Sequence, residues 1–220
     1  SLATEDSRYL AGGQSLVQSM KLRLASAENL IDLNSISGLD KISTTKESVT
    51  IGAMARHSAV ARSADVKKAI PALATMASGI GDQMVRNMGT LGGSLANADP
   101  AACYPAAVLA LDATIRTAAR ELSGNDFFRG LFETALEPGE LITEVTFKVP
   151  QQAAYVKFKQ PASRFALVGV MVARHADGVR VGVTGARTRS ARPSASPTTS
   201  TPLKTRRSPF VNATRWNRSG

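Results

Sequence analysis

The sequence has few of the residues from which proteins build metal centres, cross-links and nucleophilic sites. Its 220 residues include one cysteine, Cys103, and two histidines, His57 and His175. A single cysteine excludes an internal disulfide and a multi-cysteine metal or iron–sulfur site within this chain, and two histidines argue against a zinc centre. We interpret His57 as structural and Cys103 as a buried small residue. We therefore predict neither catalytic nor metal-binding residues here.

Long apolar runs are also missing. The longest, at 106–111 and 166–173, fall far short of the roughly 20 apolar residues that span a bilayer. The chain begins at Ser1 without a charged-then-apolar leader. We expect a cytoplasmic protein with no membrane span.

The net charge of +10 is concentrated at one end of the sequence. Residues 187–220 hold eight of the 27 Lys and Arg residues and none of the 17 Asp and Glu residues, so residues 1–186 carry 19 against 17, a net +2. Because the basic residues belong to this tail, we expect no nucleic-acid binding by the folded part.

The tail also differs from the rest in composition. It is rich in Ser, Thr and Pro and has no apolar periodicity, so it cannot bury enough apolar surface to offset its chain entropy. Two interpretations stay open: a natural, disordered basic tail, or a shift of reading frame near Gly185, which we favour.

The pattern before the tail predicts an α+β protein of short elements. Tyr9–Leu10 ends a strand, 29–33 is a buried strand, 38–42 and 48–52 form a hairpin, and Asp177–Gly178 is the turn of a second hairpin. Further strands are predicted at 114–117, 142–149 and 154–159. One or two helical turns are predicted within 15–24, and short helices at 58–62 and 64–70. Further helices are predicted to begin at Pro71, to begin at Pro100 and continue through 101–111, and to connect 127 with 136.

Two Gly-Gly segments carry the clearest functional signal. They read AGGQSL at 11–16 and TLGGSLAN at 90–97. A glycine pair removes two Cβ atoms and allows positive φ, so backbone N–H groups can converge on an anion. Either segment alone is more simply a tight turn. Two such loops facing one another would clamp a diphosphate, which indicates a bound dinucleotide.

Together with other motifs, these segments resemble the FAD-binding (medium) subunit of the molybdenum hydroxylases, the family of aerobic carbon monoxide dehydrogenase and xanthine dehydrogenase. The resemblance covers about residues 9–186. It is carried by AGGQSL, by KLR at 21–23, by TLGGSLAN, by DPAA at 99–102, by GELI at 139–142 and by FKQPASRFA at 158–166.

The resemblance implies a fold similar to vanillyl-alcohol oxidase and p-cresol methylhydroxylase, with FAD held between two α+β subdomains. Residues 1–150 would form the FAD-binding domain, divided at about 1–52 and 53–150. Residues 151–186 would begin a small C-terminal α+β domain, and 187–220 would be the tail. We expect the segment before the first loop and most of the C-terminal domain to be missing.

The resemblance also implies which residues bind the cofactor. N–H groups of the first segment would hold phosphate oxygens, the second segment would meet the pyrophosphate and ribityl chain, Asp99 would bind a hydroxyl, and Ile142 and Lys159 would lie around the flavin ring. The full set is Ala11, Gly12, Gly13, Gln14, Ser15, Thr90, Leu91, Gly92, Gly93, Ser94, Asp99, Ile142 and Lys159.

Simpler interpretations stay open for three residues. Asp99 could cap a helix that begins at Pro100, Lys159 could be a solvated strand lysine, and Phe165 could pack in the core instead of covering the ring.

The function that the resemblance implies is electron transfer. The chain would join a [2Fe–2S] small subunit and a molybdopterin large subunit in a hetero-oligomer, such as a dimer of heterotrimers. Substrate would turn over at the large subunit, and electrons would pass through FAD to NAD⁺, O₂ or a quinone. The alternatives are a standalone FAD-dependent oxidase and a truncated remnant without function.

Overall fold

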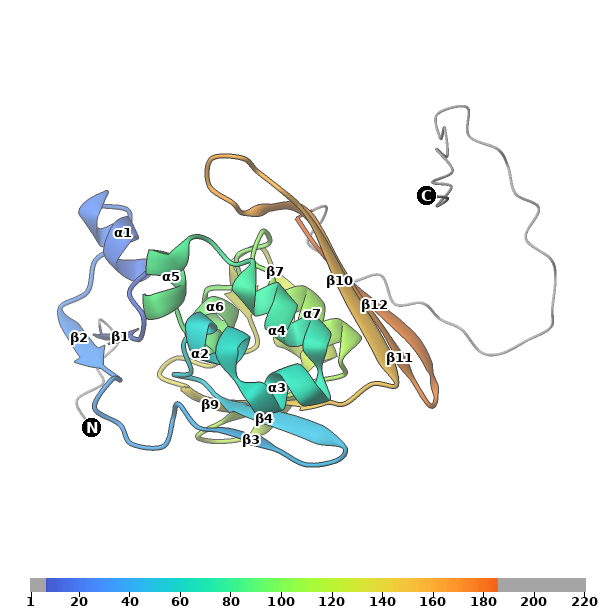
Figure 1. Ribbon diagram of the computed structural model, residues 1–220. Helices are drawn as coiled ribbons and strands as arrows, with labels where there is room; N and C mark the ends of the chain where they lie inside the picture. Colours follow the sequence, from blue (N-terminus) through green and yellow to red (C-terminus); the bar gives the residue numbers. More distant parts are fainter. Residues whose placement is uncertain (1–6, 186–220) are drawn as a thin grey trace.

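A computed structural model describes residues 7–185 of the chain. The predictions made for the tail at 187–220 therefore lie outside the described residues. The described part has mixed α/β structure in three parts, namely a small N-terminal unit, a central sheet covered by helices, and a three-stranded sheet at the opposite end (Figure 1). Within residues 7–185, no helix is both long enough and apolar enough to cross a membrane.

The N-terminal unit consists of β1 (Ser7–Leu10), α1 (Leu16–Lys21) and β2 (Asn29–Asp32). The two strands pair in parallel, with Tyr9 opposite Ile31. The sequence predicted a buried strand at 29–33. The strand is present, but it is mostly exposed, and only Leu33, which follows it, is buried. A two-stranded sheet with one short helix offers little surface against which to bury side chains.

The central sheet is antiparallel, with the strand order β3-β4-β9-β5-β6. Its strands are β3 (Ile42–Thr44), β4 (Ser48–Gly52), β5 (Thr114–Thr117), β6 (Glu121–Ser123) and β9 (Ile142–Lys148). The predicted first hairpin is present, with Ile42 opposite Ile51. Its first strand begins only at Ile42, because Gly38 adopts a φ of +87° and turns the preceding residues away.

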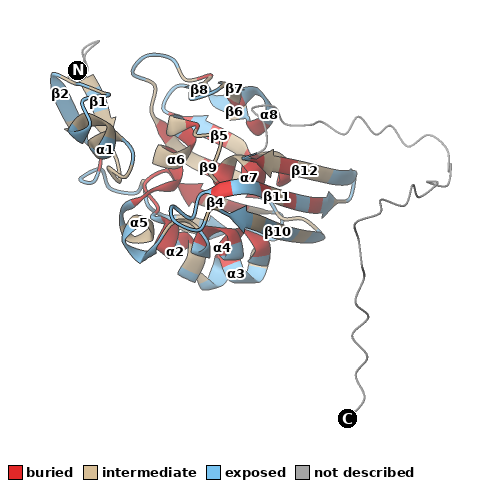
Figure 2. Cartoon of the chain, turned by 90° about the horizontal axis from the view of Figure 1, so that it is seen from above, coloured by how far each residue is buried: buried red, intermediate tan, exposed pale blue. Residues whose placement is uncertain are grey.

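Short helices pack on this sheet and on one another. They are α2 (His57–Arg62), α3 (Ala64–Ala69), α4 (Pro71–Ser78), α5 (Gln83–Met88), α6 (Leu91–Asn97), α7 (Tyr104–Ala110) and α8 (Gly124–Phe127). The Ser63 hydroxyl caps α3 by accepting a hydrogen bond from Val66 N, and Pro71 occupies the first turn of α4. Figure 2 shows the buried residues concentrated between these helices and the sheet.

The predicted helical connection between 127 and 136 is wrong. Only α8 is helical, and it leads into a small antiparallel pair of β7 (Phe128–Gly130) and β8 (Glu133–Thr134). Gly130 disfavours a helix, and Phe132 has a φ of +55°, which reverses the chain.

The C-terminal sheet is a meander of β10 (Gln152–Lys159), β11 (Ala166–His175) and β12 (Gly178–Thr184). One face packs on α4 and α7. A Cβ at Gly182 would overlap the carbonyl oxygen of Ala106, so glycine is required for this close approach. The predicted hairpin is present, but His175 pairs with Gly178, so its two-residue loop lies one position earlier than predicted.

Candidate functional site

A cavity lies where the N-terminal unit meets α5, α6 and the β10–β11 loop, which is the loop at the top of Figure 1. Its volume is about 760 Å³, within the roughly 300–1,000 Å³ of typical cofactor and small-molecule sites. Both glycine segments contribute to its wall. The cavity is therefore the candidate site for the ligand that these segments predicted.

The first glycine segment forms a turn between β1 and α1. Gly13 has a φ of +68°, which favours glycine at this position, and its carbonyl oxygen accepts a hydrogen bond from Val17 N at 3.3 Å. Within residues 7–185, the N–H groups of 12–15 donate no hydrogen bond to another protein atom. Four adjacent donors at a cavity wall can bind a phosphate group.

The second glycine segment is not the loop that the sequence predicted, because 91–97 form helix α6. Its N–H groups are already used: Leu91 N donates to Ala55 O, and Gly92 N donates to Ala53 O. Gly93 N donates to the Thr90 hydroxyl, which caps the helix. This segment therefore approaches the cavity through the surfaces of Thr90, Gly93 and Ser94 rather than through free N–H groups.

The two segments lie against one another, as the sequence predicted. A Cβ at Gly12 would overlap the carbonyl oxygen of Met88 and lie 2.8 Å from the Cα of Gly89. A Cβ at Gly93 would lie 3.6 Å from the Cβ of Ala11. The glycines therefore allow the two backbones to approach closely at the edge of the cavity.

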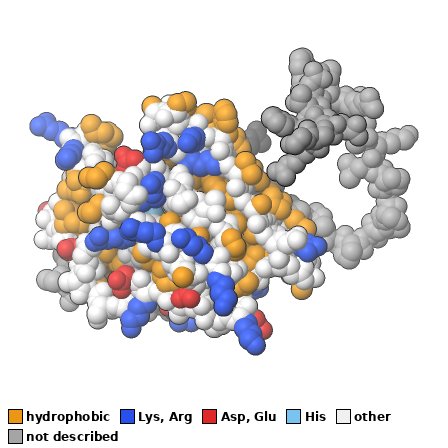
Figure 3. All heavy atoms as spheres, viewed as in Figure 1, with side chains coloured by type: hydrophobic (Ala, Val, Ile, Leu, Met, Phe, Trp, Pro, Cys, Tyr) orange, Lys and Arg blue, Asp and Glu red, His pale blue; other side chains and the backbone are white. Residues whose placement is uncertain are grey.

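Positive charge predominates in the cavity wall. Among the described residues, Arg8, Lys157 and Arg164 line it, against the single carboxylate of Asp99. The Lys157 ammonium donates to Gly79 O at 2.9 Å and lies 3.4 Å from the Cys103 sulfur. Figure 3 shows Lys and Arg side chains in excess of Asp and Glu on one face of the molecule. An anionic ligand suits such a wall.

His57 also lines the cavity, although the sequence indicated only a structural residue. It is 5% exposed, and its ring lies beside that of Tyr104, with the ring centres 5.4 Å apart and the planes tilted by 45°. Burial, helped by the nearby positive charge of Arg86, lowers the pKa of His57 to about 4. Its Nδ1 atom has no hydrogen-bond partner among the described residues. His57 is therefore a neutral ring at pH 7.

The structure brings together nine of the thirteen predicted site residues along this cavity. They are Ala11, Gly12, Gly13, Gln14, Ser15, Thr90, Gly93, Ser94 and Asp99. Leu91, Gly92 and Ile142 are buried and do not line it, and Lys159 is exposed outside it. The expected α7 start at Pro100 is wrong, because α7 begins at Tyr104. Asp99 instead accepts a hydrogen bond from Ala101 N at 2.8 Å.

The two lysines of β10 lie differently with respect to the cavity. Lys157 lines it, whereas Lys159, two residues further along the strand, is exposed and lies outside it. The register shifts beside Lys159, because Phe158 pairs with Val168 and Lys159 with Ala166, which leaves Leu167 as the extra residue on β11. Phe165, interpreted as core packing, is 50% exposed and lines the cavity.

Comparison with known proteins now identifies the domain. A family model described as "FAD binding domain in molybdopterin dehydrogenase" matches residues 2–151. The chain belongs to this family. FAD is the family's cofactor, and the free N–H groups, the cationic wall and the volume of the cavity fit a dinucleotide.

Curated relatives of this FAD-binding chain include medium chains of dehydrogenases. It is 37% identical over 175 residues to the glyceraldehyde dehydrogenase medium chain of Sulfolobus acidocaldarius, covering 77% of this chain and 62% of the relative. It is also 37% identical over 175 residues to the carbon monoxide dehydrogenase medium chain of Afipia carboxidovorans, and this match covers 76% of this chain and 61% of the relative. The FAD-binding chain thus spans about three fifths of the length of these relatives.

Solved structures share its fold. Quinoline 2-oxidoreductase from Pseudomonas putida 86 matches 82% of this FAD-binding chain and 67% of its own chain, with a TM-score of 0.77 and 32% identity. Carbon monoxide dehydrogenase from Hydrogenophaga pseudoflava matches the same shares with a TM-score of 0.77 and 34% identity. The resemblance predicted from the sequence motifs is confirmed.

Proposed function

We propose that this chain is the electron-transfer subunit of a cytoplasmic molybdenum hydroxylase complex. Its partners would be a [2Fe–2S] small subunit and a molybdopterin large subunit, in a hetero-oligomer such as a dimer of heterotrimers. FAD would supply the redox chemistry, taking electrons from the [2Fe–2S] centres and giving them to NAD⁺, O₂ or a quinone. The relatives named as medium chains of dehydrogenases support this proposal.

The observation that carries the proposal is the contrast between the two glycine segments. Within residues 7–185, the first offers four N–H groups that have no protein acceptor, whereas the N–H groups of the second donate to other protein atoms and this segment packs closely against the first. Residues 12–15 would therefore hold the diphosphate, and the surface of 90–94 would close the site from the other side. Hydrogen bonds to a charged group are roughly twice as strong as neutral ones.

The remaining predicted residues receive different roles in this proposal. Asp99 would accept a hydroxyl hydrogen bond, as it still has acceptor capacity beyond its bond to Ala101 N. Leu91, Gly92 and Ile142 would support the wall from behind. Lys157, rather than Lys159, would place a cation beside the cofactor. Residues 1–150 would form the FAD-binding domain, in subdomains of about 1–52 and 53–150, and residues 151–186 would begin the next domain.

The direct test is to titrate purified full chain with FAD and follow flavin fluorescence and visible absorption. We expect stoichiometric binding, and we expect co-expressed small and large subunits to retain the flavin-loaded chain on a tagged partner. Gly13→Val should weaken binding, because Gly13 needs positive φ and a Cβ there already lies 3.1 Å from the Val17 side chain. Protein that remains colourless once excess FAD has been added and the unbound FAD removed would overturn the proposal.

A further inference from the structure

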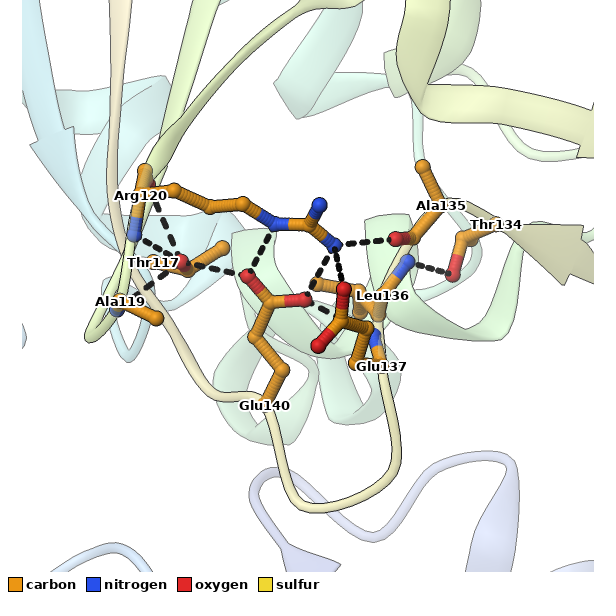
Figure 4. A network of polar contacts seen from close by, with 8 residues as sticks. All are labelled: Thr117, Ala119, Arg120, Thr134, Ala135, Leu136, Glu137 and Glu140. Atoms are coloured by element: carbon orange, nitrogen blue, oxygen red, sulfur yellow. Dashed lines mark hydrogen bonds and ion pairs between the residues drawn. The ribbon is translucent and has the colours of Figure 1, made fainter.

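Four hydrogen bonds from three residues hold the Glu140 carboxylate (Figure 4). One oxygen accepts hydrogen bonds from Arg120 Nε at 2.9 Å and from the Thr117 hydroxyl at 2.7 Å. The other accepts from Arg120 Nη2 at 2.9 Å and from Glu137 N at 2.8 Å. The side chain is only 5% exposed. These bonds satisfy all four acceptor positions of a carboxylate.

This cluster fixes the turn in which Glu140 lies. Glu140 N donates back to Glu137 O at 3.0 Å, and Arg120 Nη2 also donates to Ala135 O at 2.8 Å. Arg120 thus joins both ends of the 135–140 segment to the loop between β5 and β6. The tip of this turn is Gly139, with a φ of +75°. A turn pinned in this way holds its tip at a defined position.

The tip of the turn is attached to the first glycine segment. The Tyr9 hydroxyl donates to the carbonyl oxygen of Gly139 at 2.9 Å. Tyr9 lies on β1 and lines the cavity, two residues before Ala11. This bond joins the exposed N-terminal unit to the main body at a second place, separate from the contact of Gly12 with Met88.

The other end of the turn supports the second glycine segment. Leu141 O accepts from Ala118 N at 2.9 Å, and Thr143 O accepts from Ala53 N at 2.9 Å. Ala53 O in turn accepts from Gly92 N at 2.8 Å. The Glu140 turn therefore connects to both segments, through Tyr9 on one side and through Ala53 on the other.

A second Arg–Glu cluster on the same sheet has no such connection. Arg116 pairs with Glu121 at 2.6 Å and with Glu144 at 2.7 Å, and these side chains are 55%, 55% and 31% exposed. None of the three lines the cavity. Exposed pairs of this kind contribute little to stability. Glu144 is therefore a matched control for Glu140.

We propose that Glu140 is a positioning residue for the cofactor, because it pins the turn that holds the two glycine segments at the spacing required for FAD. This inference rests on the proposed function. Glu140 touches no ligand in this role. It acts through the Gly139–Tyr9 hydrogen bond and through the start of β9.

The test compares FAD affinity in Tyr9→Phe, Glu140→Gln, the double variant and Glu144→Gln. Loss of one neutral hydrogen bond in Tyr9→Phe should raise the FAD Kd about two- to tenfold. Glu140→Gln should raise it at least as much, and the double variant no further than Glu140→Gln alone, because both act through one linkage. Glu144→Gln should match the wild type. Equal affinity of Glu140→Gln and Glu144→Gln, or additive effects in the double variant, would overturn the inference.

Amide hydrogen exchange in the FAD-free full chain supplies a readout independent of the cofactor. Glu140→Gln and Tyr9→Phe should speed exchange in β1, and Glu144→Gln should not. If the wild type fails to bind FAD, the proposed function is wrong, and the exchange comparison alone then tests the role of Glu140. Unchanged amide exchange in β1 of Glu140→Gln would overturn the inference. If Glu140→Gln does not fold, Thr117→Val removes one donor to the same carboxylate and takes its place in both measurements.

Discussion

Gly12 lies directly against the backbone of Met88, leaving no room for a side chain at position 12. The two residues belong to segments far apart in sequence, and their contact forms the edge at which the N-terminal unit meets the helical body. Glycine at position 12 therefore does more than expose N–H groups to a ligand. It allows the two walls of the cavity to touch.

Gly12→Ala should consequently separate the walls. The added Cβ would overlap backbone atoms, which cannot rotate away as a side chain can. We expect FAD affinity to fall at least about tenfold, corresponding to roughly 1.4 kcal/mol, which isothermal titration calorimetry can measure. Gly79→Ala is the control, since its Cβ would lie 3.5 Å from the nearest heavy atom. Unchanged affinity in Gly12→Ala would show that the contact is dispensable.

Lys157→Met and Lys159→Met distinguish the two lysines of β10. Lys157 lines the cavity and donates to Gly79 O, whereas Lys159 is exposed outside it. Lys157→Met should raise the FAD Kd by about tenfold or more, as expected for loss of a hydrogen bond to a charged group. The FAD Kd of this variant should also depend less on salt concentration than that of the wild type. Lys159→Met should leave both nearly unchanged. A larger effect at Lys159 would favour the placement expected from the sequence resemblance.

His57 should make the stability of the protein depend on pH in a defined window. Its pKa is lowered from 6.5 to about 4 in the fold, chiefly by burial. The unfolded chain therefore binds more protons between these values, and the free energy of unfolding should fall as the pH decreases from 6.5 to 4. His57→Phe keeps a ring beside Tyr104 but removes this titration, so the wild type should lose about 3 kcal/mol relative to the variant across the window.

The measurement for His57 is chemical denaturation of both proteins at several pH values between 7 and 4. Titration of the imidazole proton signals by NMR gives a direct check, and the chain's two histidines make assignment simple. Parallel stability curves, or an imidazole signal that titrates near 6.5, would contradict the prediction.

Glu140 should stabilise the folded protein near neutral pH, and this contribution should be lost at acid pH. Its pKa is lowered from 4.5 to about 2, chiefly by the hydrogen bond from Arg120. A carboxyl group with a depressed pKa stabilises the fold above its unfolded value, and that contribution is lost as the pH falls through the folded value. The difference in unfolding free energy between wild type and Glu140→Gln should therefore narrow from pH 4.5 towards pH 2. Denaturant titrations at pH 7, 4 and 3 check this, and a constant difference would refute it.

Local sequence patterns predicted most elements, but not the burial of every strand or the ends of every element. The start of α4 at Pro71 was predicted correctly, since proline acts on the residues adjacent to it. The burial of β2 was mispredicted because an apolar strand is buried only when another layer covers it. The connection after Phe127 was mispredicted as helical because its reversal depends on Phe132 adopting positive φ, which its residue type does not favour.

Sequence by itself determined the family, the cofactor and the two glycine segments of the site, because these depend on residue types at fixed spacing along the chain. Only the tertiary structure decided which residues face the cavity. It placed Lys157 rather than Lys159 at the cavity wall, made the second glycine segment a helix with occupied N–H groups, and brought His57 and Phe165 to the wall. It also joined Glu140 to both segments through Tyr9 and Ala53. Such placements depend on contacts between residues far apart in sequence, which local propensity does not specify.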